Sequence, residues 1–142
     1  MATNEEIIRE VYAAAEAKDL DPDKFVSLFA EDGYFLDMAS GQKWTGEEVR
    51  QPIGGLASAF PDFHRDLLQI YSTSDGVVVV ELKLQGTHEG DFPTPSGLMA
   101  ATGKRIDVPC CDVFHVKDGK VKSFHCYNMK SVWFDQLGAS KV

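Results

Sequence analysis

Residues 112–121 read Asp-Val-Phe-His-Val-Lys-Asp-Gly-Lys-Val, and this stretch is the clearest indication of the fold. Its first half is rich in β-branched and aromatic side chains, and Lys117-Asp118-Gly119-Lys120 is typical of a tight turn. An Asp-Gly turn between two apolar runs favours a hairpin. We therefore predict antiparallel strands near residues 105–116 and 120–129.

Two further runs upstream have the same character. They lie near residues 63–72 and 75–87, and Ser74-Asp75-Gly76 predicts a second hairpin between them. A shorter aromatic run at 34–38 suits a strand of about five residues. The second half of the chain is therefore dominated by strands.

The beginning of the chain has helical patterns instead. Thr3 and Glu6 form a capping box before a helix expected over residues 4–17. Asp21-Pro22 starts a second helix, which we expect to end near Gly33. Helices followed by strands indicate one α+β domain over residues 1–142, built on an antiparallel sheet.

Three other segments connect or follow these elements. Residues 45–59 begin as a helix, but Pro52 and two glycines predict that it is broken or kinked. Residues 90–103 form a long loop of the kind that often serves as a lid or rim. A short helix is expected over residues 131–137.

Composition excludes several classes of function. The chain has 142 residues and a net charge of −8, so its scattered Lys and Arg side chains are unsuited to gripping nucleic acid or anionic membranes. The N-terminus is polar from the start, and no run approaches membrane-spanning length, which predicts a cytoplasmic protein. Three cysteines, two of them adjacent, suit a reducing compartment better than a disulfide framework.

Four short sequence motifs, in this order and spacing, resemble those of a known family. They are Leu-Phe-Ala-Glu-Asp-Gly at 28–33, Gly-Thr-His-Glu-Gly at 86–90, the hairpin at 112–121, and Gln-Leu-Gly at 136–138. Together they resemble the nuclear transport factor 2-like superfamily, and within it the SnoaL-like polyketide cyclases. The resemblance implies a cone-shaped, curved sheet around an apolar pocket for a small molecule. It also implies a homodimer built on the outer sheet face, with no metal or organic cofactor.

The steroid isomerases of this superfamily imply two acids. Asp37 matches the position of their general base, and Asp112 matches the acid that donates a hydrogen bond to an oxyanion. A carboxylate beside a carbonyl can move a proton, and a neutral carboxylic acid can stabilise the resulting enolate. Alternatively, Asp37 supports the turn that follows its strand, and Asp112 makes hydrogen bonds inside the sheet.

The isomerases also use a tyrosine near the position of Tyr12. Because Tyr12 is offset by one residue, or 100° around a helix, core packing with its hydroxyl on a polar group is the alternative. The cyclases pair a histidine at the position of His115 with an aspartate on the last strand. That aspartate position falls on Met129, which cannot move a proton.

Strand alternation limits which side chains meet. Asp112 and His115 are three residues apart, so a regular strand sends them to opposite faces and only a bulge brings both into one pocket. On the last strand we expect His125 and Tyr127 to face the pocket, with His125 joining Asp37 and Asp112 as candidate catalytic residues. A histidine satisfied within the sheet is the alternative.

Large apolar side chains should complete the pocket. We expect Trp44, Phe92, Met99 and Phe114 to contact the ligand, together with Met129. Phe92, Leu98 and Met99 lie in an otherwise polar loop, where they gain nothing by exposure unless they cover a pocket or meet a partner. A lid is therefore predicted.

The cysteines and His125 raise the possibility of a metal site, since sulfur and imidazole suit zinc. Their spacing is unfavourable for a metal site, because adjacent residues on a strand, such as Cys110 and Cys111, point to opposite faces. Buried cysteine is also a common core residue. We expect no metal.

Two functions are compatible with these features. The first is a cofactor-independent isomerase, cyclase or dehydratase that acts on a small apolar carbonyl compound of polyketide or terpenoid character. The second is a non-catalytic binder of small molecules, or a dimeric interaction module with the same fold. A structure with both aspartates in one cavity would fit the first function.

Overall fold

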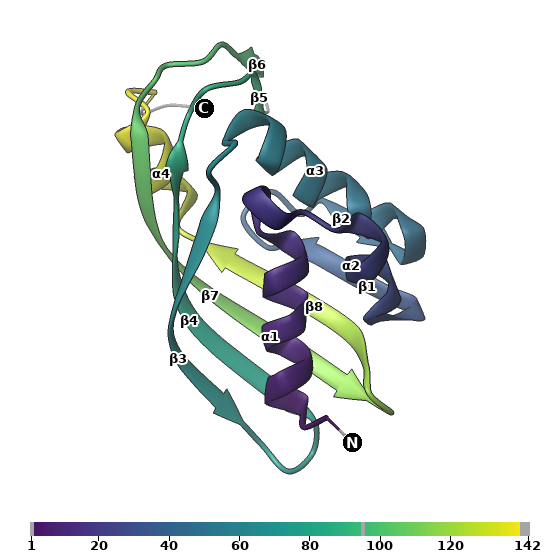
Figure 1. Cartoon of the computed structure of the whole chain (residues 1–142). Coiled ribbons are helices and arrows are strands. Elements are labelled where there is room, and N and C mark those ends of the chain that lie inside the picture. Colours follow the sequence, from purple (N-terminus) through teal and green to yellow (C-terminus); the bar gives the residue numbers. More distant parts are fainter. Residues whose placement is uncertain (1, 95, 140–142) are drawn as a thin grey trace.

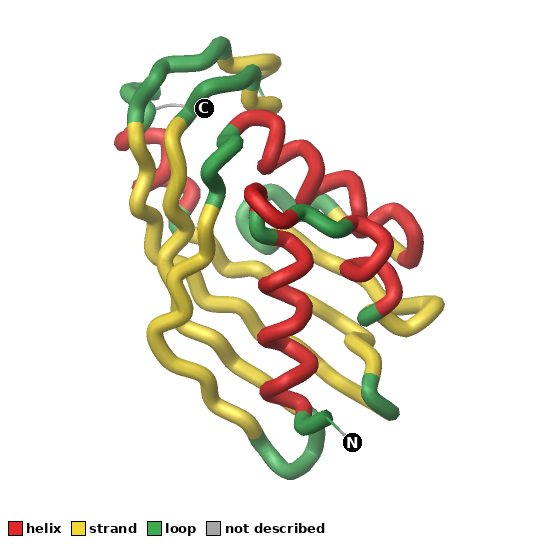
Figure 2. The backbone as a smooth tube through the Cα atoms, in the orientation of Figure 1, coloured by secondary structure: helices red, strands yellow, loops and turns green. Residues whose placement is uncertain are grey.

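A computed structural model describes residues 2–94 and 96–139. It has a strongly curved sheet with helices on its concave face (Figures 1 and 2). The strand order in the main sheet is β2-β1-β8-β7-β4-β3, and β5 and β6 form a separate hairpin. The strands are β1 (Phe29–Asp37), β2 (Lys43–Thr45), β3 (His64–Ser72), β4 (Val77–Thr87), β5 (Phe92–Thr94), β6 (Gly97–Met99), β7 (Arg105–Lys117) and β8 (Lys120–Asn128).

Helices open the chain, interrupt the strands once and close it. The α-helices are α1 (Asn4–Ala15), α2 (Pro22–Ser27), α3 (Arg50–Ala59) and α4 (Lys130–Gln136), and the short 3₁₀ helices are η1 (Ala17–Asp19) and η2 (Gly46–Val49). The predicted capping box at Thr3 and Glu6 is present at the start of α1. Within the described residues, no helix is long and apolar enough to cross a membrane.

The α+β class and the two predicted hairpins are confirmed. β3 pairs with β4, and β7 pairs with β8, both antiparallel. β4 and β7 also pair antiparallel and join the two hairpins within the sheet. Among the described strands of the main sheet, β1 departs from this pattern, because it runs parallel to β8.

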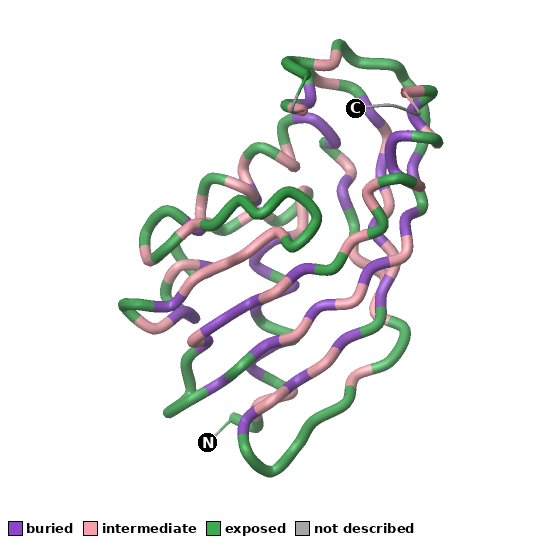
Figure 3. The backbone as a smooth tube through the Cα atoms, turned by 180° about the vertical axis from the view of Figure 1, so that it is seen from behind, coloured by how far each residue is buried: buried purple, intermediate pink, exposed green. Residues whose placement is uncertain are grey.

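Strict alternation along β7 separates the two faces of the sheet. Its buried residues take every second position and include Cys110, Asp112 and Phe114, whereas Cys111 and His115 point to the other face. Figure 3 shows the same alternation from behind, where strands rather than helices face the viewer. The core lies between the concave face and the helices, and the outer face has no helical cover among the described residues.

Some predicted boundaries were wrong. The second helix ends at Ser27 rather than near Gly33, because residues from Phe29 onward pair with β8. Gly33 is needed for that close approach, since a Cβ atom there would lie 2.5 Å from the carbonyl oxygen of Val121. The expected broken helix at 45–59 is divided into η2 and α3, with Pro52 tolerated in the first turn of α3.

The loop at 90–103 contains the β5–β6 hairpin, in which Phe92 pairs with Met99. Phe92 is buried, while the neighbouring Leu98 is 70% exposed. Pro95, within the same loop, lies outside the described residues. The hairpin thus places Phe92 against the core, as expected for a residue at the rim of a pocket, whereas Leu98 points to solvent.

Candidate active site

A cavity of about 280 Å³ lies between the concave sheet face and the helices. Its walls come mainly from α1, α3, α4, β1 and β8, with one or two residues each from α2, the other strands and the connecting loops. The lining is mainly apolar, with Asp37, Arg65, Asp112 and Asn128 among its polar members. A cavity of this kind can hold one small molecule and orient it through a few polar groups.

Asp112 and Tyr12 form the most deeply buried polar pair in the cavity wall. The Tyr12 hydroxyl donates to Asp112 Oδ2 at 2.7 Å, and the Cys110 thiol donates to Asp112 Oδ1 at 3.3 Å. Burial raises the pKa of the Asp112 carboxyl, although these hydrogen bonds favour its charged form. Burial, followed by the charge of Asp112, also raises the pKa of Tyr12 well above its ordinary value. The net effect is a carboxyl group at Asp112 that is less acidic than usual, because burial outweighs the hydrogen bonds.

Arg65 brings a positive charge to the same cavity. Its Nη1 donates to the carbonyl oxygen of Ala15 at 3.0 Å, and its guanidinium carbon lies 4.7 Å from the centre of the Phe63 ring. Burial lowers the pKa of Arg65, while the charge of Asp112 acts in the opposite direction. Among residues 2–94 and 96–139, no carboxylate forms an ion pair with Arg65. Its remaining donors are thus suited to an oxygen atom of a ligand.

Asp37 also lines the cavity, but its acceptor sites are in use. Oδ1 accepts from the backbone N–H of Ala39 and from Asn128 Nδ2, both at 3.1 Å. Oδ2 accepts from Ser40 Oγ at 2.9 Å and from Lys130 Nζ at 3.1 Å. A carboxylate offers about four lone-pair sites, so this network leaves none of them free. The hydrogen bonds from Ala39 and Ser40 fit the alternative role of Asp37, which is to support the turn that follows its strand.

Two polar atoms in the cavity wall are buried without a partner among the described residues. They are Asn128 Oδ1, an acceptor, and Trp133 Nε1, a donor. Buried polar groups are nearly always hydrogen-bonded, and an unpaired one costs about 1–3 kcal/mol.

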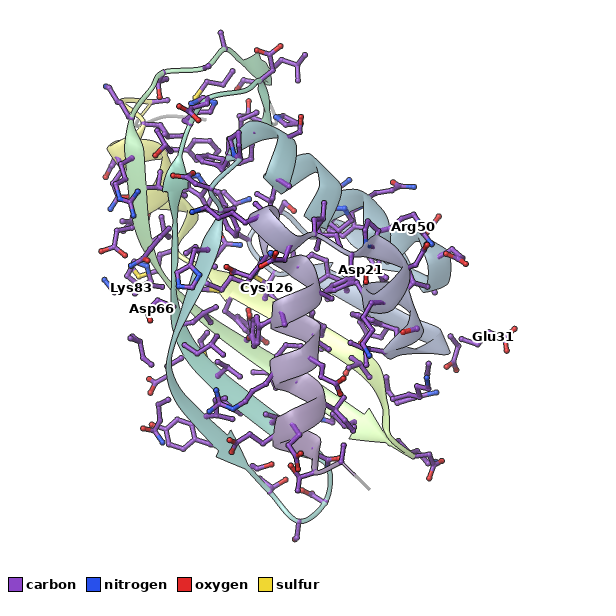
Figure 4. The ribbon with its side chains drawn as sticks, viewed as in Figure 1. Asp21, Glu31, Arg50, Asp66, Lys83 and Cys126 are labelled. Atoms are coloured by element: carbon purple, nitrogen blue, oxygen red, sulfur yellow. The ribbon has the colours of Figure 1, made fainter. Side chains whose placement is uncertain are left out.

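The expectation that His125 and Tyr127 face the pocket is wrong. Asp112 pairs with Cys126 in the β7–β8 ladder, so Cys126 shares the inner face and His125 points outward. His125 Nε2 lies 2.9 Å from the Tyr34 hydroxyl, and Tyr127 is 46% exposed. Figure 4 shows the side chain of Cys126 in the interior behind α1.

Other predicted site residues are divided between the cavity and its surroundings. Trp44 and Phe92 line it. Phe114 lies in the core, where its ring centre is 5.8 Å from that of Tyr12, rather than in the cavity lining. Met99 packs against the core outside the lining, and Met129 is 48% exposed. These three were therefore misplaced as ligand contacts.

His115 lies on the outer face, 3.1 Å from Ser123 Oγ through its Nδ1. Asp112 and His115 thus point to opposite faces, as a regular strand predicts. The register shift between β7 and β8 comes after His115 and does not bring it into the cavity.

The profile of the SnoaL-like domain matches residues 8–124. The chain belongs to the SnoaL-like domain family. The matched segment contains Tyr12, Arg65 and Asp112, whereas the wall formed by Asn128 and Trp133 follows it in the sequence. No curated protein matches this SnoaL-like chain significantly by sequence.

Solved structures confirm the fold of the SnoaL-like chain. A candidate SnoaL-like polyketide cyclase from Jannaschia sp. CCS1 has a TM-score of 0.82 at 19% identity, covering 96% of this chain and 92% of that one. IdmH, a candidate polyketide cyclase from Streptomyces antibioticus, has a TM-score of 0.80 at 19% identity, covering 96% and 99%. A protein with a ketosteroid isomerase-like fold from Catenulispora acidiphila DSM 44928, solved with trimethylamine, has a TM-score of 0.77 at 23% identity, covering 96% and 95%. The predicted nuclear transport factor 2-like fold is therefore correct.

Proposed function

We propose that this protein is a cofactor-independent acid/base enzyme of the isomerase, cyclase or dehydratase type. Its substrate would be a small, largely apolar carbonyl compound of polyketide or terpenoid character. The observation that carries the proposal is Asp112, a carboxyl group that burial makes less acidic, in the wall of a mostly apolar cavity.

The proposed reaction begins with the Asp112 carboxylate. It removes a proton from the carbon next to the ligand carbonyl, and the electrons of the broken C–H bond form an enolate. Arg65 lines the same cavity, and its guanidinium would stabilise the enolate oxygen. Return of the proton to another carbon completes an isomerisation. Alternatively, attack of the enolate carbon on a second carbonyl closes a ring, and the proton held by Asp112 passes to the new alkoxide oxygen.

Supporting residues hold these groups in place. Tyr12 fixes the Asp112 carboxyl through the hydrogen bond to Oδ2. Asp37 holds Asn128 and Lys130 at the end of β8 and the start of α4, and we assign it this positioning role. His125, on the outer face, takes no part in the proposed reaction.

Native mass spectrometry of the purified protein tests whether the cavity retains a small molecule. The identified ligand, or a close carbonyl analogue, is then incubated with the protein in D₂O and followed by NMR. We expect deuterium to enter the carbon next to the carbonyl faster than in buffer alone. A ligand that is retained without any exchange would contradict acid/base catalysis and support the non-catalytic binder.

Arg65→Met should weaken binding of that ligand about 10- to 100-fold, because a hydrogen bond to a charged group contributes about 1.5–3 kcal/mol. Arg65→Lys keeps the charge but not the planar donor geometry, so its effect should be intermediate. Isothermal titration calorimetry measures both. Arg9→Met, on the exposed part of α1, is the matched control, and equal losses in both Met variants would contradict a ligand contact at Arg65.

A non-catalytic binder is the second candidate function. The hydrogen bonds to Asp37 favour the binder, because they occupy all of its acceptor sites. Of the two aspartates predicted to act as a catalytic pair, only Asp112 can then accept a hydrogen bond from a ligand. The deuterium experiment separates the two functions, since a binder retains the ligand and leaves its C–H bonds intact.

We further propose that two copies of the chain pair through the outer sheet face. This face presents Tyr127 and Tyr71, which are 46% and 50% exposed. Tyr127→Asp should convert a dimer to a monomer in size-exclusion chromatography with light scattering, because an unpaired charge would be buried in the interface. Leu98→Asp, on the β5–β6 hairpin, is the control and should leave the dimer intact. A dimer that survives Tyr127→Asp would contradict this arrangement.

A further inference from the structure

Three ligand-type atoms meet at the base of the cavity. Cys110 Sγ and Cys126 Sγ are 3.6 Å apart, and Cys110 Sγ lies 3.3 Å from Asp112 Oδ1. The ligand atoms of these three buried residues all lie within 4.8 Å of one another. The β7–β8 register explains the meeting, because Asp112 pairs with Cys126 and Cys110 is two residues away on the same face.

This arrangement was not visible in the spacing of the cysteines. The adjacent pair consists of Cys110, which points inward, and Cys111, which points to the outer face. The relevant partner of Cys110 is Cys126, on the next strand. The cluster therefore depends on strand pairing rather than on a short sequence motif.

Two of the three separations between ligand atoms are close to those of a tetrahedral zinc site. With Zn–S bonds of about 2.3 Å and a Zn–O bond of about 2.0 Å, tetrahedral angles separate two sulfurs by about 3.7 Å and a sulfur from an oxygen by about 3.5 Å. The observed separations of 3.6 Å and 3.3 Å are slightly shorter than these values, and small side-chain movements would remove the difference. Thiolates also favour zinc over the hard cations that prefer oxygen ligands.

We propose that Cys110, Cys126 and Asp112, in the reduced protein, bind one zinc ion. Asp112 and Cys126 line the cavity, so the fourth coordination position would open toward it. Three protein ligands with one open position are typical of zinc sites that can bind water or a small ligand.

Surrounding residues support the site. Tyr12 holds Oδ2 of Asp112, which leaves Oδ1 on the side of the sulfur atoms, and Asn128 Nδ2 donates to Cys126 Sγ at 3.5 Å. Such outer contacts orient metal ligands. Two thiolates and a carboxylate carry three negative charges against the two positive charges of zinc. The charge of Arg65, which acts on both Asp112 and Cys126, offsets the remaining one.

Zinc binding requires both thiols to lose their protons. The hydrogen bond with Cys126, and then burial, raise the pKa of the Cys110 thiol, so the metal-free cluster is protonated at neutral pH. Zinc must displace these protons, and its apparent affinity should increase as pH rises. The site goes beyond the proposed acid/base function, because zinc and the ligand proton would compete for Asp112.

Titration of the reduced protein with Co²⁺, followed by displacement with Zn²⁺, tests the inference. We expect one Co²⁺ per chain, with a thiolate-to-cobalt charge-transfer absorption that zinc removes. Cys110→Ser and Cys126→Ser should abolish that absorption, whereas the matched control Cys111→Ser should keep it. Absence of the band from the reduced wild-type protein, its persistence in Cys126→Ser, or its loss in Cys111→Ser would overturn the proposal.

Two further variants retain both thiols, in case the serine variants do not fold. Asp112→Asn should keep the charge-transfer band with affinity lowered at least 10-fold, and Tyr12→Phe should lower affinity about 10-fold through the lost outer contact. Unchanged affinity in both would overturn the site as drawn. These measurements follow metal binding alone, so a protein that binds zinc without exchanging ligand protons would contradict only the proposed function.

Discussion

Asp112→Asn is expected to slow deuterium exchange of the bound ligand by about 10²- to 10⁴-fold, the contribution typical of a positioned acid or base. Asparagine has nearly the same shape and can still accept the Tyr12 hydroxyl, so ligand binding should persist. In the wild-type protein the exchange rate should fall as pH decreases through the pKa of Asp112, because only the carboxylate acts as a base. Burial raises that pKa, so the decrease should begin above the ordinary value of 3.8.

Asp37→Asn is the matched control in the same cavity. It removes the charge that pairs with Lys130 at 3.1 Å but leaves Asp112 and Tyr12 in place. We expect exchange to fall by less than 10-fold. A larger loss in Asp37→Asn than in Asp112→Asn would assign the base to Asp37 and contradict the positioning role proposed for it.

The stability of Asp112→Asn provides an independent check. Because the pKa of Asp112 is raised in the folded protein, its ionised form disfavours folding above that pKa, and the effect disappears below the unfolded value of about 3.8. At pH 7 the Asn variant should therefore be at least as stable as the wild type in urea unfolding. The difference between the two should shrink as the pH falls. A variant markedly less stable at pH 7 would indicate that the carboxylate itself stabilises the fold.

Phe60→Ala should lower the free energy of unfolding by about 3–5 kcal/mol, the usual cost of removing a buried phenylalanine ring. Phe60 is fully buried, and its ring centre lies 5.2 Å from that of His88, 5.3 Å from Phe92 and 5.8 Å from Trp133. Since small domains have a total stability of about 5–15 kcal/mol, this loss is a large share of it. Urea unfolding followed by tryptophan fluorescence measures the change.

Leu98→Ala is the control for this measurement. Leu98 is 70% exposed on the β5–β6 hairpin, so its truncation should change the free energy of unfolding by no more than about 0.5 kcal/mol. A loss below about 1 kcal/mol in Phe60→Ala would contradict the central position that we give to this aromatic cluster.

Local sequence patterns were sufficient for most of the fold. The Thr3 capping box, the two Asp-Gly turns and the apolar runs depend on neighbours within a few residues, and each marks the element predicted from it. The prediction was wrong where a distant strand competes with a local preference. Residues 29–33 continue a helical pattern, but pairing with β8 places them in β1.

The candidate site was only partly predictable. Asp37, Asp112, Tyr12, Trp44 and Phe92 were expected to line the cavity, and they do. Arg65 was missed because a single basic residue in a strand carries no local signal of burial. Its place in the cavity depends on the carbonyl of Ala15 and the ring of Phe63, which the curvature of the sheet brings together.

The sequence alone predicted that Asp112 and His115 lie on opposite faces of one regular strand, because side-chain alternation is a property of the strand itself. Which face of the neighbouring strand meets Asp112 depended on the register between β7 and β8. A shift of one residue exchanges the two faces, and the observed register selects Cys126 rather than His125. Only the tertiary structure could decide this, and with it the sulfur atoms beside Asp112 that form the proposed zinc site.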